Sequence, residues 1–207
     1  MNLMARTVAL AGTIATLLAV PGLASAQGLT GSAMVNALKK GGYVIVLRHA
    51  SSPREAPDEK TANADNVTRE RQLDTAGRAD ATALGKALRE LAIPIGTVLS
   101  SPTYRALETA RFAQLPNPQV AAELGDRGQS MQGVSDADGA WLRSKVVPSS
   151  TATNTMLITH LPNITQAFPQ YASGIADGDA LVFSADGKGG ATLVGVIKIA
   201  EWPAFRR

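Results

Sequence analysis

The sequence predicts a three-layer α/β/α sandwich with a mostly parallel central sheet and a C-terminal antiparallel hairpin. Three short apolar runs, separated by segments of helical periodicity, indicate strands that helices cover on both faces. Near the end of the chain, a glycine-rich turn joins two further strand-like runs, the pattern of a hairpin. The apolar runs are 43–47, 95–99 and 155–159, and the hairpin runs are 180–183 and 191–199.

The start of the chain has the pattern of a secretory signal. Arg6 supplies a positive charge, 8–20 is an apolar stretch, and Ala24-Ser25-Ala26 is a small-residue cleavage site. Because the stretch is shorter than the about 20 residues that span a bilayer, an anchor is the less favoured alternative. We expect residues 1–26 to be a cleaved signal peptide and 27–207 to form one domain, exported without stable membrane insertion and periplasmic in a Gram-negative bacterium.

Composition excludes several classes of function. The formal net charge of the 207 residues is only +3, and the basic residues are scattered among acidic ones, so no stripe favours nucleic acid as a partner. The chain has no cysteine, which rules out disulfides, thiolate nucleophiles and thiolate metal ligands. A local cluster of charges is enough for a small anionic substrate, and the sequence leaves the oligomeric state open.

The first predicted strand, 43–47, follows a predicted helix over 29–40 and ends at Arg48-His49. After it, 51–71 is a long polar segment, which indicates either disorder or the mouth of a site. Three arginines lie in this segment with acidic neighbours, so a solvated loop is favoured over a substrate contact for them. They are Arg54, Arg69 and Arg71.

Two helices flank the second predicted strand. Asp74 or Thr75 is expected to cap the first of them, which ends before Pro94. After 95–99, Ser101 is a suitable N-cap and Pro102 suits the first helical position, predicting a helix to Gln114.

The third predicted strand, 155–159, ends at His160, and Pro162 is placed to open a further helix. Between the second and third strands, 120–124 is a candidate edge strand. A helix is expected from Asp136 or Asp138 to about Lys145.

Both histidines of the chain lie at predicted strand ends. Ligands of open α/β sheets bind at the carboxyl ends of the strands, where Arg48-His49, Arg105 and His160 are expected to meet. Arg105 would lie in the first turn of its helix, where the free amide groups also favour an anion. Two arginines and two histidines without an acidic cluster indicate a phosphate pocket.

Four segments, in this order and spacing, resemble the signatures of the histidine phosphatase superfamily, also called the phosphoglycerate-mutase-like family. The likeness covers most of the chain between Tyr43 and Ile164. The segments are Leu47-Arg48-His49-Ala50, Leu73-Asp74-Thr75-Ala76-Gly77, the stretch 99–110 around Arg105, and Ile158-Thr159-His160.

The resemblance implies a role for each matching residue. His49 becomes the nucleophile, Arg48 and Arg105 hold the phosphoryl oxygens, and His160 is a second imidazole beside the phosphate. The family's proton-donating carboxylate corresponds to Asp126, with Glu123 as the alternative. Here the sequence departs from the family, because Asp126 replaces a glutamate and the residues after it differ, as do those after Ala50.

The implied activity is hydrolysis of a small phosphate monoester through a phosphohistidine, without a metal or other cofactor. Sugar phosphates and phosphates of the lipopolysaccharide core are substrates that the resemblance and the expected export suggest, and a phosphohistidine protein is a further one. Two alternatives stay open: a phosphoglycerate-type mutase and a non-catalytic module that binds a phosphorylated ligand.

Overall fold

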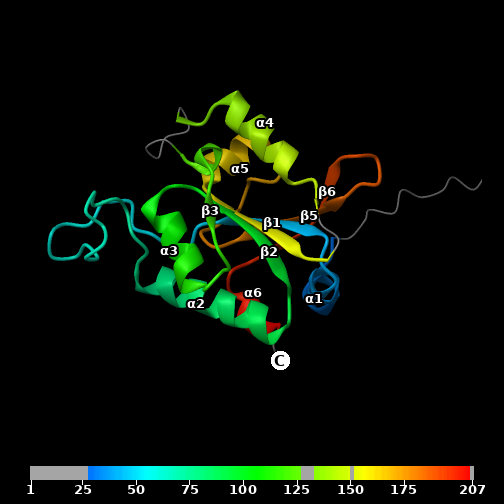
Figure 1. Cartoon of the computed structure of the whole chain (residues 1–207), viewed down its shortest axis with the longest axis horizontal. Helices are drawn as coiled ribbons and strands as arrows, with labels where there is room; N and C mark the ends of the chain where they lie inside the picture. Colours follow the sequence, from blue (N-terminus) through cyan, green and yellow to red (C-terminus); the bar gives the residue numbers. More distant parts are fainter. Residues whose placement is uncertain (1–27, 127–132, 150–151, 206–207) are drawn as a thin grey trace, which may run out of the picture.

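The computed structural model describes residues 28–126, 133–149 and 152–205, so the predicted signal peptide and the residues just after Asp126 lie outside the described part. Its centre is a six-stranded sheet of order β3-β2-β4-β1-β5-β6 (Figure 1). The first four strands of this order run parallel, while β5 is antiparallel to both β1 and β6. The strands are β1 (Tyr43–Arg48), β2 (Ile95–Ser100), β3 (Gln119–Val120), β4 (Asn154–Thr159), β5 (Ala180–Ala185) and β6 (Ala191–Ile197).

Helices cover both faces of the sheet, which confirms the predicted three-layer sandwich (Figure 1). Successive residues of β1 face opposite layers: Ile45 and Leu47 belong to one apolar cluster, Val44 and Val46 to the other. In the described residues, no helix is long and apolar enough to span a bilayer. The first layer contains α1 (Gly31–Lys39), α2 (Thr75–Glu90), α3 (Tyr104–Phe112) and α6 (Glu201–Ala204), and the second contains α4 (Asp136–Lys145) and α5 (Leu161–Ala167).

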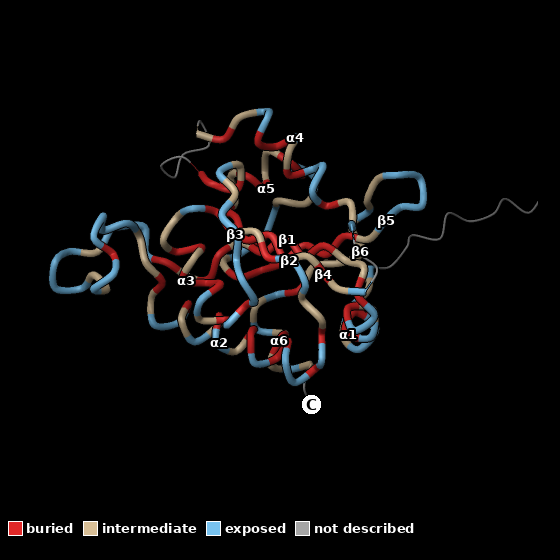
Figure 2. Tube along the Cα trace, viewed as in Figure 1, coloured by how far each residue is buried: buried red, intermediate tan, exposed pale blue. Residues whose placement is uncertain are grey.

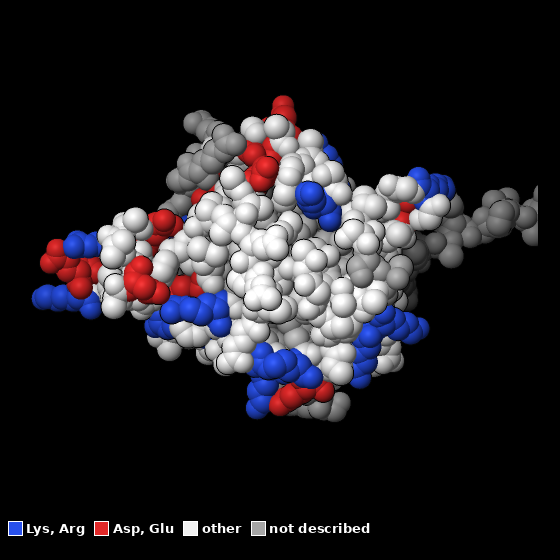
Figure 3. Space-filling model, in the orientation of Figure 1, with Lys and Arg blue, Asp and Glu red and all other residues white. Residues whose placement is uncertain are grey.

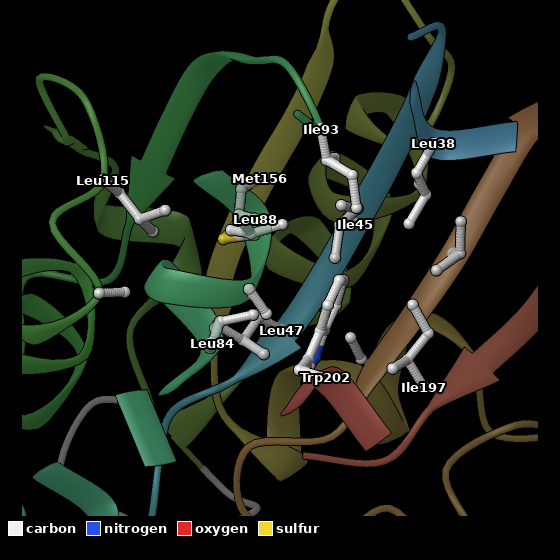
Figure 4. Close-up of a cluster of buried hydrophobic side chains, with 14 of the residues drawn as sticks. Leu38, Ile45, Leu47, Leu84, Leu88, Ile93, Leu115, Met156, Ile197 and Trp202 are labelled. Atoms are coloured by element: carbon white, nitrogen blue, oxygen red, sulfur yellow. The ribbon is translucent and has the colours of Figure 1, made fainter. Parts of the chain in front are cut away.

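The larger apolar cluster includes Trp202 of α6. Its side chain is fully buried beside Leu47 and Ile197, with Leu84 of α2 close by (Figure 4). Strands β1, β4 and β5 lie in the buried centre of the molecule, whereas the edge strands β3 and β6 are more exposed (Figure 2). The sequence did not predict α6, because a helix of four residues is too short to show a 3.6-residue period.

Three predicted boundaries were wrong. The expected edge strand over 120–124 is the two-residue β3 followed by a 3₁₀ turn, Ala122–Leu124, which turns Leu124 into the core. The helix expected from Pro102 begins at Tyr104 with Thr103 as its N-cap. The last strand ends at Ile197, two residues early, because the chain then turns into α6.

Strand register brings the predicted site residues to one edge of the sheet. In the parallel pairs Arg48 lies opposite Thr159, and Ser100 lies opposite Ile158, so the chain leaves β1, β2 and β4 at the same level. The antiparallel β5 begins there as well, since Ala180 pairs with Leu47. The segment 175–179, which comes just before β5 in the chain, therefore lies at the same edge of the sheet as the ends of β1, β2 and β4.

Candidate active site

His49 follows the last residue of β1 and is 3% exposed. Its Nδ1 lies 2.8 Å from the carbonyl oxygen of Ala50, which can only accept a hydrogen bond, so Nδ1 carries the proton. Nε2 then has the lone pair, and it accepts a hydrogen bond from Nε of Arg105 at 3.2 Å. The two contacts together fix the tautomer and leave Nε2 as the nucleophilic nitrogen.

The surroundings of His49 favour its neutral form. Burial lowers the pKa of His49 from 6.5 to about 3; the hydrogen bond to Ala50 opposes this shift, and the positive charges of Arg105, Arg48 and Arg71 add to it. At neutral pH the ring is therefore an uncharged base with an available lone pair.

Arg105, in the first turn of α3, connects the buried groups of the site. It is 2% exposed and forms an ion pair with Asp126 through the same NH2 group that lies 3.0 Å from Nδ1 of His160. Its Nε donates to Nε2 of His49. A single guanidinium thus fixes two imidazoles and one carboxylate.

His160 follows β4 and precedes α5, where it is 1% exposed. Arginine nitrogens only donate, so Nδ1 of His160 accepts from Arg105, and the ring proton lies on Nε2, 2.8 Å from the hydroxyl of Ser101 and 3.3 Å from that of Thr103. Burial, followed by the charges of His49 and the nearby arginines, lowers the pKa of His160 well below its ordinary value. The two rings lie 5.1 Å apart between centroids.

Arg48 contributes a second guanidinium from the end of β1. Its NH1 donates to the carbonyl of Ile175 at 2.7 Å, and its NH2 forms an ion pair with Asp177 at 2.6 Å. Both partners come from the segment before β5. The side chains of this pair are 21% and 27% exposed, so Arg48 and Asp177 are accessible from the pocket.

These groups line a pocket of about 490 Å³. Its walls carry four arginines against two aspartates, and because both imidazoles are neutral, the charge excess is positive and suits a phosphate dianion. The lining residues are Arg48, His49, Ser52, Arg54, Arg71, Arg105, Asp126, His160, Leu161, Pro162, Thr165 and Asp177.

Two of the three loop arginines lie at the pocket, and one of these, Arg54, is also exposed to solvent as expected. Arg54 and Arg71 line the pocket, and Arg71 donates to the backbone carbonyl groups of Ser52 and Pro53, which folds it back toward the site. Arg69 does lie in solvent, paired with Glu59 at 2.6 Å.

Loop 51–71 projects from the body of the molecule (Figures 1 and 2), and its base is bound to α3. Glu108 accepts from Nδ2 of Asn63 at 2.8 Å and from the amide of Leu73 at 2.7 Å, and the hydroxyl of Tyr104 donates to Asp65. On the face in Figure 3, charges of both signs gather over this loop. These contacts fix the loop to α3.

Asp126 and Glu123 differ in position. Asp126 lines the pocket, 3% exposed and paired with Arg105, and its Oδ2 lies 3.7 Å from Nδ1 of His160. Glu123 lies in the 3₁₀ turn outside the lining, and only its backbone carbonyl bonds to Asn163. Of the two expected carboxylates, Asp126 is the one that reaches the site.

Across residues 28–126, 133–149 and 152–205, no group of three or more histidine, aspartate or glutamate side chains could hold an ion. The imidazole nitrogens of the site contact Arg105, the carbonyl group of Ala50 and the hydroxyl groups of Ser101 and Thr103.

Sequence reasoning missed Asp177, Ser101 and Thr103. Asp177 lies in no motif. It faces the site because β5 pairs antiparallel with β1 and so begins at the edge where β1 ends, a pairing that the sequence does not show. Sequence alone does not show which neighbour a hydroxyl faces, so the contacts of Ser101 and Thr103 with His160 could not be predicted.

The comparisons with known proteins concern the family and the fold of this chain. The model of the histidine phosphatase superfamily (branch 1) matches residues 44–128, which include His49, Arg105 and Asp126 and end before His160. No curated protein matches the chain significantly by sequence.

Solved structures share the fold. One is the protein histidine phosphatase SixA complexed with tungstate, at 20% identity and a TM-score of 0.55, covering 77% of this chain and 98% of that one. Another is a mutant phosphoserine phosphatase from Entamoeba histolytica in complex with phosphoserine, at 11% identity and a TM-score of 0.52, covering 76% and 97%. At these low sequence identities, the comparisons show a shared fold only.

Proposed function

Because the chain belongs to the histidine phosphatase superfamily, we propose that it hydrolyses phosphate monoesters through a phosphohistidine on Nε2 of His49. The observation that carries this proposal is the state of His49: a neutral ring, with Nδ1 bound to the Ala50 carbonyl and its Nε2 lone pair directed to a guanidinium of the pocket. A nucleophilic nitrogen that needs no deprotonation suits attack on phosphorus.

In the proposed first step, Nε2 of His49 attacks phosphorus in line with the ester oxygen. Arg48 and Arg105 bind the equatorial oxygens, and their charge is worth most where water is excluded. A bound dianion also favours protonation of His160, because an opposite charge nearby raises the pKa of an imidazole. His160 then donates a hydrogen bond to the phosphoryl group. In the second step, water attacks the phosphohistidine and releases inorganic phosphate.

The decisive experiment is an assay of purified protein on p-nitrophenyl phosphate in the presence of a metal chelator. The wild type should turn over the ester, and His49→Ala should lose essentially all activity, because it removes the nitrogen that attacks phosphorus. After rapid acid-free quenching, the wild type should also carry a phosphoryl group that acid removes and alkali does not, as expected of a phosphoramidate.

Arg111→Ala serves as the control variant, because Arg111 is exposed on α3 and outside the pocket. Equal activity in wild type and His49→Ala would refute the nucleophile. Binding of phosphate without turnover would favour the non-catalytic module. With 3-phosphoglycerate, formation of the 2-isomer without free phosphate would favour a mutase.

The substrate we propose is a small phosphorylated molecule, with sugar phosphates and lipopolysaccharide-core phosphates as the first candidates outside the cytoplasm. The support is the predicted signal peptide and the modest volume of the pocket. A panel of sugar phosphates, phosphoserine and a phosphohistidine protein should rank these classes by kcat/KM. Fractionation of cells expressing the full chain tests the compartment, and retention in the cytoplasm would refute export.

A further inference from the structure

We propose that Asp177 is the carboxyl group that protonates the leaving oxygen, and that Asp126 is a positioning residue for Arg105 and His160. This inference rests on the proposed phosphatase function and adds to it a catalytic residue that no family motif contains. It assigns different tasks to the two aspartates of the pocket.

Asp177 has the accessibility that a proton donor needs. Its side chain lines the pocket and is 27% exposed, and its Oδ1 lies 2.6 Å from NH2 of Arg48, one of the two guanidinium groups expected to bind the phosphoryl group. A carboxyl group beside the phosphate-binding arginine is therefore within reach of the ester oxygen.

The turn that carries Asp177 is fixed to the nucleophile's own backbone. The amide of Gly178 donates to the carbonyl groups of Arg48 and His49, at 3.2 and 2.9 Å, and the amide of Arg48 donates to the carbonyl of Asp179 at 3.0 Å. The buried carboxylate of Asp179 closes the turn by accepting from the amide of Ala176 at 2.9 Å. Gly178 has φ +80, and a Cβ there would meet Ile199 at 2.8 Å, so the turn needs glycine. Such anchoring holds a reacting group in place before substrate arrives.

Asp126 is placed differently. It is almost completely buried in an ion pair with Arg105, whose NH2 group also contacts His160. The pair encloses the carboxylate, whose side chain is 4% exposed, against 27% for that of Asp177. Its position explains how Arg105 and His160 keep their orientation.

The surroundings of Asp177 favour the protonated form that an acid requires. Burial raises the pKa of Asp177, and Asp74 adds to this, while Arg48, Arg71 and Arg105 oppose it. A phosphoryl dianion in the pocket would take over the contact with Arg48 and place negative charge beside Asp177. Both changes disfavour a second negative charge on the carboxylate.

The proton and bond changes balance over the two steps. As the bond between Nε2 of His49 and phosphorus forms, the ester P–O bond breaks, and the leaving oxygen takes the proton of Asp177 and departs as an alcohol. Water then attacks phosphorus, gives a proton to the Asp177 carboxylate, and the N–P bond breaks. Inorganic phosphate leaves, and both His49 and Asp177 return to their starting forms.

The test compares two substrates of similar size with different leaving groups. p-Nitrophenolate leaves readily without a proton, whereas phenolate is more basic and depends more on an acid. General acid catalysis contributes about 10²–10⁴-fold, so we expect Asp177→Asn to widen the ratio of kcat/KM for p-nitrophenyl over phenyl phosphate by at least about tenfold. Asp126→Asn should lower both rates alike, and Asp80→Asn, outside the pocket, should leave both unchanged.

Asp177→Glu keeps the proposal testable if Asp177→Asn folds poorly, since a longer carboxyl should restore the wild-type ratio at least in part; thermal unfolding of each variant checks the fold. An unchanged ratio in folded Asp177→Asn would overturn the assignment, and so would widening in Asp126→Asn instead. Absence of turnover by the wild type on both esters would refute the phosphatase function itself, which is a different result.

Discussion

At the scale of the residue, the centre of the site is the guanidinium of Arg105. It contacts both imidazoles and Asp126 from a position that is 2% exposed. These contacts need a planar group with several donors in fixed directions, which lysine lacks. Removing them also leaves the buried Asp126 carboxylate without its partner.

Arg105→Lys is therefore expected to lose activity although the charge is kept. Each charge-assisted hydrogen bond is worth about 1.5–3 kcal/mol, and two lost bonds correspond to about 10²–10⁴-fold in kcat/KM. The measurement is steady-state hydrolysis of p-nitrophenyl phosphate. Arg111→Lys on the exposed side of α3 is the matched control, and a loss below tenfold for Arg105→Lys would contradict this account of the site.

The five residues expected at the site from the sequence do meet in one pocket: Arg48, His49, Arg105, Asp126 and His160. Four of them could be placed because strand ends are visible as the abrupt end of an apolar run, and parallel strands end at one edge. Asp177 could not be found in this way, since its place depends on which strand the final hairpin pairs with, and that pairing is a tertiary property.

At the scale of the element, the first turn of α2 packs directly on the segment after the nucleophile. Asp74 caps the helix by accepting from the amide of Gly77 at 2.6 Å and accepts from the hydroxyl of Ser51 at 2.8 Å. A Cβ on Gly77 would lie 2.1 Å from the carbonyl oxygen of Ser51, a backbone atom that cannot easily move. The glycine thus sets the distance between α2 and the chain that holds His49.

Gly77→Ala tests this contact, because the sign of the change in the free energy of unfolding shows which effect dominates. Helix propensity alone favours alanine by about 1 kcal/mol, whereas overpacking against backbone costs about 1–3 kcal/mol. We expect a lower free energy of unfolding in urea and a lower kcat, because displaced Ser51 and Ala50 no longer orient His49. Lys86→Ala, exposed on the same helix, should change stability by at most about 0.5 kcal/mol. A stabilised Gly77→Ala would refute the close contact.

Elements with a long or strongly apolar pattern were predicted well, and short ones were not. The run 43–47 became β1 almost residue for residue, because unbroken β-branched residues suit a strand buried on both faces. The stretch 120–124 was mistaken for a strand, since the sheet offers β3 only two pairs with β2 before the chain turns inward. Propensity does not show where a neighbouring strand ends.

At the scale of the whole molecule, both histidines of the chain are buried and neutral in the same pocket. In the folded state the pKa of His49 is lowered to about 3, and that of His160 is lowered as well, while in the unfolded chain both return to about 6.5. Below pH 6.5 the unfolded state therefore binds more protons than the folded state. By linkage, stability must fall as the pH falls through this range.

We expect the free energy of unfolding of the ligand-free protein to decrease by up to about 1.4 kcal/mol per pH unit for each histidine below pH 6.5. Urea unfolding at pH 7, 6 and 5, on protein without a histidine tag, measures this slope. The double variant His49→Asn/His160→Asn should show a clearly flatter dependence. The same slope in both proteins would mean that the imidazoles are not neutral in the fold.

The direction of β5 has one more consequence. The strand starts beside the pocket and runs away from it for six residues, about 20 Å at the usual rise, so the turn between β5 and β6 lies at the opposite end of the sheet. Figure 1 shows this turn and loop 51–71 on opposite sides of the molecule. The turn is therefore a natural attachment point for a fluorophore or a surface tether, where the molecule can be immobilised with its pocket facing the solution.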